Sequence, residues 1–293
     1  MKGKTVLITG ANTGIGYETA KDLLQRDARV IMACRNLNRG QQASNQLVSE
    51  TGCNENNIRL MECDLCSLDS VRAFAKLYNE EEERLDVLIC NAGLSWASPM
   101  VTTDGFNSII QANYLGHFLL TYLLLDKLRK YRRSRVINVS SKLHNKIKSI
   151  NWLDVFTQSR TLPWFGAYPS SKLFQILSTV KLRQQLYGNE GIDVFTLTPG
   201  WVSTSLSNPT PQAIGWFGFI FCYPLVRFLK FFMAKTPKTG ASTVIFCAVE
   251  PSLEQSEDLY FQNCKAVKPS SLAINQLSAD RLWKLSRTAV ELQ

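Results

Sequence analysis

The sequence contains only two histidines, His117 and His144, among 293 residues. Structural zinc sites need several cysteine and histidine ligands, and the pair Cys63 and Cys66 is the only CxxC in the chain. We therefore expect no metal site and interpret these two cysteines as small buried residues at the end of a strand. The eight cysteines are scattered along a long chain, so we expect reduced thiols rather than a disulfide scaffold.

The sequence also lacks a long uninterrupted apolar run. Its most apolar stretch, 213–232, is broken by Gly215, Gly218 and Pro224 before the ~18 apolar residues typical of a membrane span accumulate. The N-terminus enters a strand-like run at once, so we expect no signal segment. The expected location is intracellular, either cytoplasmic or peripheral on an endoplasmic-reticulum-type membrane.

Acidic residues are outnumbered, at 24 against 33 lysines and arginines, which gives a formal net charge of +9. A hydrophobic fraction of 45% excludes a disordered or collagen-like chain. We find no nucleic-acid motif, and the basic residues are not gathered in one helix, so we expect no nucleic-acid partner. The charge is compatible with a phosphate-rich ligand and with a membrane surface.

Short apolar runs alternate with helix-like segments along most of the chain, a pattern typical of βαβ units around a buried parallel sheet. We predict an α/β fold, a Rossmann-type doubly wound parallel sheet of about seven strands flanked by helices, in a single domain over 1–293. Strands are predicted at 4–9, 29–34, 57–63, 86–90, 135–140, 192–198 and 258–261. Helices are predicted at 14–26, 68–78, 103–131, 167–187, 236–249 and 279–289. A further helical stretch follows the second strand and runs through residue 50.

Three glycines, Gly10, Gly14 and Gly16, lie between the first strand and the first helix. Glycine permits a tight turn and lets a diphosphate approach the backbone, while the following helix points free N–H groups at the anion. We therefore predict a nucleotide site that also uses Asn12, Thr13 and Ile15. The spacing differs from the commoner Gly-x-Gly-x-x-Gly.

The second strand ends at Arg35, where NAD-selective sites usually carry an acidic residue. A guanidinium there suits a 2′-phosphate and favours NADP(H); the alternative is a solvated surface arginine. Asp64 and Leu65 follow the third strand and would bound the adenine pocket. Asn91, Ala92 and Gly93 follow the fourth strand at the ligand-binding edge of the sheet, although such a triplet is also an ordinary turn. 

Tyr168 and Lys172 are four residues apart and share one face of a predicted helix. An ammonium near a phenol lowers the phenol pKa from ~10, which a tyrosine needs for acid/base work near neutral pH. By itself this spacing is frequent at protein surfaces. Ser140 and Ser141 end the fifth strand at the same edge and offer hydroxyls to a substrate oxygen; by themselves they also suit a turn or helix cap.

Taken together, these motifs resemble the short-chain dehydrogenase/reductase family over nearly the whole chain. The matching pieces occur in family order: TGANTGIG at 9–16, NAG at 91–93, Asn113 in QANYLGHF, NVSS at 138–141, YPSSK at 168–172, and Pro199-Gly200 with Thr204. Within the family the chain looks most similar to the retinol dehydrogenase subgroup, on GANTGIGYETA, ACRN, NYLGHFLLT, and the tail LYFQNC followed by RLW.

The resemblance implies a role for each matching residue. Tyr168 would be the general acid/base, and Lys172 would hold the nicotinamide ribose and lower the tyrosine pKa. Ser141 would bind and orient the substrate oxygen, and Asn113 would support Lys172 through a water. Thr204 and Pro199 would lie at the nicotinamide.

Residues 205–233 fall where this family places its substrate lid, after the sixth strand. The segment is rich in aromatic and aliphatic residues, with Arg227, Lys230 and Lys235 beside them. One interpretation is a lipophilic substrate reached through peripheral contact with a membrane surface. The other is a lid packed on its own core or on a second subunit, as in a homodimer.

These motifs predict an NADP(H)-dependent oxidoreductase that interconverts a lipophilic alcohol and its aldehyde, of retinol/retinal type. A carbonyl reductase for steroids or other lipophilic ketones has the same motifs, because pocket shape sets that choice. A catalytically silent NADP-binding protein is the alternative from another class, and the intact Asn113, Ser141, Tyr168 and Lys172 set argues against it.

Overall fold

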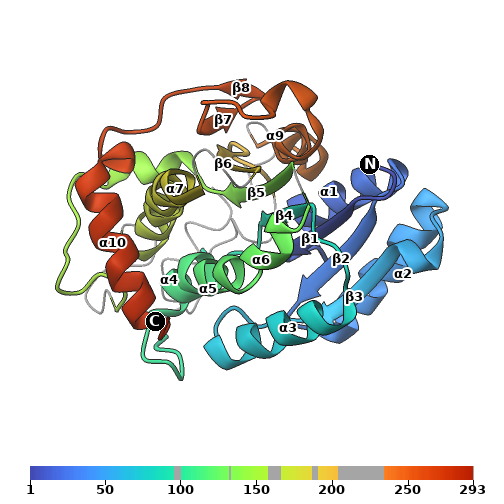
Figure 1. Cartoon of the computed structure of the whole chain (residues 1–293), viewed down its shortest axis with the longest axis horizontal. Coiled ribbons are helices and arrows are strands. Elements are labelled where there is room, and N and C mark those ends of the chain that lie inside the picture. The colour runs from blue at the N-terminus through green and yellow to red at the C-terminus, as the bar shows by residue number, and fades with distance from the viewer. Residues whose placement is uncertain (96–99, 132, 158–165, 187–190, 204–233, 293) are drawn as a thin grey trace, which may run out of the picture.

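The computed structural model describes residues 1–95, 100–131, 133–157, 166–186, 191–203 and 234–292, and its centre is one eight-stranded sheet (Figure 1). The strands run β1 Thr5–Thr9, β2 Arg29–Cys34, β3 Ile58–Glu62, β4 Val87–Cys90, β5 Ser134–Val139, β6 Ile192–Thr198, β7 Tyr260–Gln262 and β8 Lys265–Ala266. Their order in the sheet is β3-β2-β1-β4-β5-β6-β7-β8. The first seven are parallel, and β8 pairs antiparallel with β7.

Helices cover both faces of the sheet, as a doubly wound fold requires (Figure 1). The helices are α1 Gly14–Gln25, α2 Leu37–Thr51, α3 Leu68–Glu81, α4 Ser108–Ile110, α5 Gly116–Leu123, α6 Leu125–Arg129, α7 Ala167–Leu186, α9 Pro237–Val249 and α10 Gln276–Ala289. The side chains of alternate residues of β1 point to opposite faces of the sheet and pack in two different hydrophobic cores. Leu7 packs in the core with α3, α5, α7 and α10, whereas Val6 and Ile8 pack in the core with α1, α2 and α9. Strands buried on both faces explain the continuous apolar runs of the sequence.

The helix predicted at 103–131 is interrupted. It begins later, because the side chain of Asn107 accepts hydrogen bonds from the N–H groups of Ile109 and Ile110 and caps the first turn. A π-helical segment, Gln111–Leu115, separates α4 from α5, and Leu124 separates α5 from α6. Single π turns inside helices are frequent at functional sites, and this one contains Asn113.

The chain leaves β1 toward β2 on one side and returns to β4 on the other side. The carboxyl ends of β1 and β4 therefore flank a topological switch point, which is where doubly wound folds bind ligands. The prediction of about seven strands missed β8, which is only two exposed residues long. The predicted lid at 205–233 and Thr204 lie outside the described residues.

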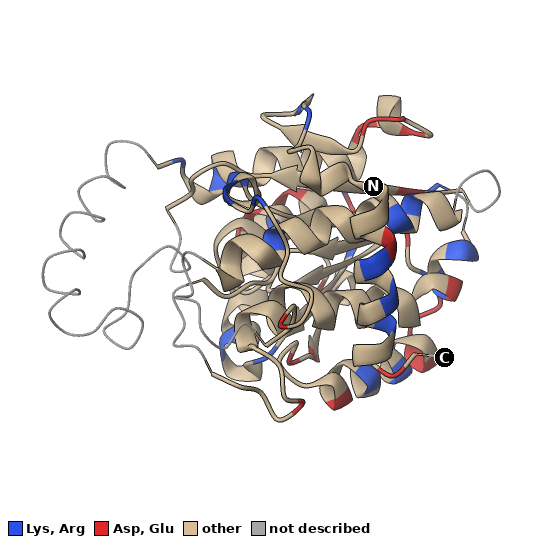
Figure 2. Cartoon of the chain, turned by 90° about the vertical axis from the view of Figure 1, so that its left-hand side faces the viewer, with Lys and Arg blue, Asp and Glu red and all other residues tan. Residues whose placement is uncertain are grey.

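The charged residues of the described chain are mixed in sign, and Figure 2 shows basic and acidic positions interspersed on the same helices. Within the described ranges, no helix is both long and apolar enough to span a bilayer. The seven cysteines of those ranges are free thiols. The described ranges also contain no group of three or more His, Cys, Asp or Glu residues that could hold a metal ion.

Candidate active site

The glycine-rich turn after β1 packs directly against the turn after β4. Gly10 has φ of +67°, and a Cβ there would lie 3.0 Å from the Cα of Ala92. A Cβ on Gly16 would collide with the carbonyl oxygen of Gly10 and with the side chain of Asn91. Asn91 Nδ2 donates to the carbonyl of Thr9 at 2.9 Å. Asn91 thus braces the turn, and side chains larger than hydrogen do not fit at Gly10 or Gly16.

A pocket of about 130 Å³ opens beside this turn, at the switch point of the sheet. Seven of the predicted cofactor residues line it: Gly10, Asn12, Arg35, Asp64, Leu65, Ala92 and Gly93. Cys63 and Cys66 also line it, so the CxxC pair lies at this pocket. The other described residues of the cofactor prediction lie outside its lining: Thr13, Gly14, Ile15, Gly16, Asn91, Tyr168, Lys172 and Pro199.

Two charged side chains lie at the pocket. Arg35 is exposed, and no carboxylate of the described residues pairs with it. Asp64 is engaged, since its Oδ1 accepts the N–H of Cys66 at 2.9 Å. Arg35 is thus available to an anion that reaches the mouth of the pocket.

Tyr168 lies in the first turn of α7 and faces the end of β5. Its hydroxyl is hydrogen-bonded to the side chain of Ser141. Burial raises the pKa of Tyr168 to about 12, and the bond to Ser141 opposes this only in part. The phenol is therefore protonated at neutral pH, whereas the sequence predicted a pKa lowered by Lys172.

The surroundings of Lys172 explain why this residue does not lower the pKa of Tyr168. Its Nζ lies 5.6 Å from the centre of the Tyr168 ring and donates to the carbonyl of Val139 at 2.8 Å and to Gln175 Oε1 at 3.2 Å. The side chain is buried, and this burial lowers its pKa to about 7. In the cofactor-free chain, the loss of hydration thus outweighs any attraction between the ammonium and the phenolate.

Asn113 is linked to Tyr168 and Lys172 through Ser171 and Gln175. Its Nδ2 donates to Ser171 Oγ at 3.0 Å, and Ser171 Oγ in turn donates to the carbonyl of Tyr168 at 2.7 Å. The carbonyl of Asn113 accepts from Gln175 Nε2 at 2.8 Å. Gln175 therefore links Lys172 to the main-chain carbonyl of Asn113, and the water-mediated link that the resemblance implies stays a prediction.

His117 is fully buried behind Asn113. Its Nδ1 lies 3.1 Å from the carbonyl of Asn113, and its Nε2 lies 2.8 Å from Thr9 Oγ1. A carbonyl only accepts, so Nδ1 carries the proton and Thr9 donates to Nε2. Thr9 also accepts the N–H groups of Asn91 and Ala92, both at 3.0 Å. The neutral ring thereby connects the nucleotide turn to the π-helical segment.

This buried imidazole predicts acid sensitivity. Burial lowers the pKa of His117 from 6.5 to about 4, so below pH 6.5 the unfolded chain binds a proton that the folded chain does not. The stability present above pH 6.5 is lost as the pH falls toward 4, by about 3 kcal/mol. Urea unfolding of wild type and His117→Gln at pH 7.5 and 4.5 measures this loss. The loss should be smaller in the variant, and equal losses would contradict the assignment.

Sequence reasoning missed Gln175, His117, Ser171 and Thr9. The available signal was helical spacing, because Gln175 lies one turn after Lys172 and His117 one turn after Asn113. The four side chains are buried and hydrogen-bonded, which sequence spacing alone does not show.

The described residues fit a nicotinamide dinucleotide. The turn at Gly10 and Gly16 leaves no room for side chains where a diphosphate would approach. A protonated Lys172 has three N–H donors, and two find acceptors among the described residues. A Cβ on Gly93, which lines the nucleotide pocket, would lie 3.9 Å from Lys172 Nζ. The third donor thus lies beside that pocket, where a ribose hydroxyl could accept it.

The glycine turn, the pocket at the switch point and the Ser141–Tyr168–Lys172 cluster define a class of nucleotide-dependent oxidoreductases. A family model described as short chain dehydrogenase matches residues 4–214. The chain belongs to the short-chain dehydrogenase/reductase family, whose members are oxidoreductases that use NAD or NADP.

Its relatives include several retinol dehydrogenases. The chain is 38% identical to Retinol dehydrogenase 12 of Mus musculus, covering 99% of this chain and 87% of that protein. It is 40% identical to Retinol dehydrogenase 14 of Homo sapiens, covering 100% of this chain and 88% of that protein. Among solved structures, an uncharacterised protein from Mycobacterium paratuberculosis is 30% identical, with a TM-score of 0.74, and the match covers 100% of this chain and 95% of that one.

Proposed function

We propose that the chain is an NADP(H)-dependent oxidoreductase that interconverts a lipophilic alcohol and its aldehyde, of retinol/retinal type. The observation that carries this proposal is the buried Tyr168 hydroxyl, hydrogen-bonded to Ser141 and protonated at neutral pH. A protonated phenol beside a serine hydroxyl suits the donation of a proton to a carbonyl oxygen.

In the reducing direction, a reduced nicotinamide, when bound, would supply a hydride to the carbonyl carbon. Ser141 Oγ donates a hydrogen bond to the carbonyl oxygen and orients it, and Tyr168 Oη delivers the proton to the developing alkoxide. Lys172, when charged, would bind the ribose through its third N–H and would stabilise the phenolate that remains. In the oxidising direction the same atoms act in reverse, with Tyr168 Oη accepting the alcohol proton.

The substrate class rests on the relatives. Relatives that are 38–40% identical over nearly the full length bear the name Retinol dehydrogenase, and retinol is a long apolar alcohol. The apolar sequence of 205–233 supports a lipophilic substrate as well. A steroid or lipid ketone remains the alternative, and a substrate panel separates the two.

Arg35 underlies the proposed preference for NADP(H). The Arg35→Asp variant removes a free guanidinium at the nucleotide pocket and places a carboxylate there, which repels a 2′-phosphate and accepts from ribose hydroxyls. The ratio of kcat/KM for NADPH over NADH should fall about tenfold to a hundredfold. Arg26→Ala removes an arginine that pairs with Asp22 on α1 and should leave the ratio unchanged. An unchanged ratio in Arg35→Asp would show that Arg35 is only a surface charge.

The test of the proposed function follows nucleotide absorbance with all-trans-retinal, a steroid ketone and a lipid ketone as substrates, each with NADPH and with NADH. Oxidation of NADPH that is fastest with retinal supports the proposal. If NADPH is oxidised only with the ketones, the protein is a reductase whose substrates are ketones and not retinal. Tight NADPH binding with no oxidation of any substrate supports the silent nucleotide-binding protein.

A further inference from the structure

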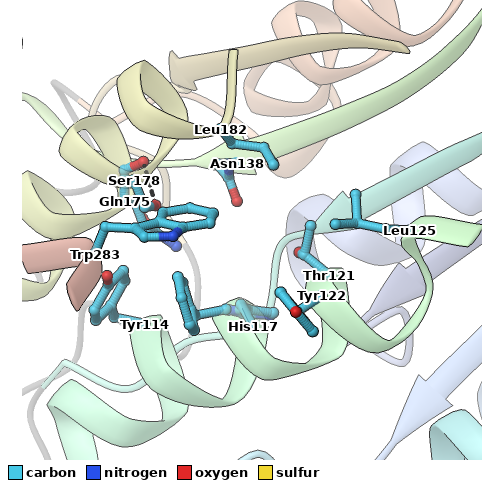
Figure 3. Close-up of a pocket in the computed structure, with 11 residues that line it drawn as sticks. Tyr114, His117, Thr121, Tyr122, Leu125, Asn138, Gln175, Ser178, Leu182 and Trp283 are labelled. Carbon is cyan, nitrogen blue, oxygen red and sulfur yellow. Dashed lines mark hydrogen bonds between the residues drawn. The ribbon is translucent and has the colours of Figure 1, made fainter. Parts of the chain in front are cut away.

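A small cavity lies between α5, α7 and α10, and Gln175 is among the residues that line it (Figure 3). It has a volume of about 20 Å³, which is room for a water molecule. Figure 3 shows Gln175 and Ser178 on one side of the Trp283 indole and Tyr114 and His117 on the other. The buried Nε1 of Trp283 has no hydrogen-bond partner in the part of the chain that the structure describes.

Gln175 separates this cavity from Lys172. The side chain is 1% exposed, and both ends of its amide are used. Its Oε1 accepts from Lys172 Nζ at 3.2 Å, and its Nε2 donates to the carbonyl of Asn113 at 2.8 Å. The charged ammonium of Lys172 only donates and the carbonyl only accepts, so the chemistry of the two partners fixes the orientation of the amide.

We propose that Gln175 is a positioning residue for the catalytic lysine, because its amide fixes the Lys172 amine relative to the backbone carbonyl of Asn113. The inference rests on the proposed function and adds a residue to its machinery. Val139 holds a second N–H of Lys172. With both acceptors in place, the ammonium has one N–H left, and its direction is set by the other two. Losing Gln175 would let Lys172 rotate away from the ribose and from Tyr168.

Two substitutions at Gln175 distinguish a positioning role from a packing role, because the two roles predict opposite orders of activity for them. Gln175→Met fills the space but supplies no acceptor, so Lys172 loses a partner. Gln175→Ala enlarges the cavity beside it and lets a water bridge Lys172 and Asn113. A positioning role makes Met the worse variant for catalysis, whereas a packing role makes Ala the worse one.

The first experiment measures kcat/KM with NADPH and retinal, together with the free energy of unfolding. Gln175→Met should lose at least about tenfold in kcat/KM, and Gln175→Ala about threefold, although Ala is the less stable protein. Ser178→Ala is the matched control, since it lines the same cavity one turn along α7, and it should stay within about twofold of wild type. Activities that follow stability, with Ala the worst, would overturn the proposal.

The second experiment needs no turnover. The side-chain ¹⁵N signal of Lys172 is titrated in the cofactor-free protein, with Lys172→Met to assign it. Gln175→Met removes an acceptor and should lower the pKa of Lys172, whereas Gln175→Glu adds a carboxylate and should raise it. Among the described residues, the other titratable groups facing Lys172 are Tyr168 on α7, Cys90 on β4 and His117 on α5, and all are unchanged in these variants.

The two experiments distinguish the possible failures. If wild type oxidises neither nucleotide with any substrate, the proposed function fails, and the titration alone decides the role of Gln175. Opposite shifts in the Met and Glu variants support that Gln175 holds Lys172. A Lys172 pKa that stays the same in both variants overturns it, whatever the activities are.

Discussion

Replacing Tyr168 by phenylalanine is expected to lower kcat for retinal reduction by about 10²- to 10⁴-fold. The substitution removes the one phenol hydroxyl that is hydrogen-bonded to Ser141 and keeps the ring in its buried place. The affinity for NADPH, followed by quenching of protein fluorescence, should change little, because the pocket at Gly10, Arg35 and Gly93 is untouched. A kcat within about tenfold of wild type would remove Tyr168 from the proton transfer.

Tyr78→Phe is the matched control for this variant. Tyr78 on α3 is also buried, its hydroxyl donates to the carbonyl of Arg84 at 2.9 Å, and it does not line the pocket beside the glycine turn. The same chemical change should cost about 1 kcal/mol of stability and leave kcat intact. A parallel loss of kcat in both variants would point to damage to the fold instead of lost chemistry.

Replacing Lys172 by methionine is expected to abolish turnover and yet stabilise the cofactor-free protein. Burial lowers the pKa of Lys172 to about 7 from 10.5, so between these values the unfolded chain binds the extra proton. Stability therefore rises with pH from 7 to 10.5 in wild type, and at pH 8 the buried lysine costs about 3 kcal/mol. Methionine avoids this cost but leaves Val139 and Gln175 without a donor, so we expect a net gain of about 1 to 2 kcal/mol.

Chemical unfolding of both proteins at pH 8 and pH 10 measures the gain in the free energy of unfolding. It also shows whether the rise of stability with pH seen in wild type is missing in Lys172→Met. Lys181→Met on the same helix is the control, because Lys181 pairs with Asp280 at 2.7 Å at the surface, and it should lose at most about 1 kcal/mol. A Lys172→Met protein that is less stable than wild type at pH 8 would show that the lysine is charged and satisfied in the fold. Stability gained at the expense of activity is common at functional sites.

Much of the nucleotide half of the site follows from local sequence. Continuous apolar runs such as that of β1 identify buried parallel strands, and glycines between a strand and a helix identify a tight turn. Gly10, Asn12 and Arg35 lie together because the carboxyl ends of parallel strands meet at one edge. The fold class and the nucleotide pocket therefore follow from short-range patterns.

The electrostatics of the chemical half do not follow from spacing. The separation of Tyr168 and Lys172 indicates that they share a helix face, but the depth of burial raises one pKa and lowers the other. The π-helical segment at Asn113 and the bridging amide of Gln175 depend on tertiary contacts between α7 and the preceding helix. The sequence predicted an uninterrupted helix there, because no proline in 103–131 marks a break.

The most direct test of the account is hydride transfer itself. Wild type is incubated with all-trans-retinal and NADPH that carries deuterium at both positions of nicotinamide C4, and the alcohol product is analysed by mass spectrometry. The account predicts retinol with one deuterium on the carbinol carbon, formed by wild type and lost in Tyr168→Phe. Unchanged retinal in the presence of bound NADPH, or an alcohol without deuterium, would contradict it.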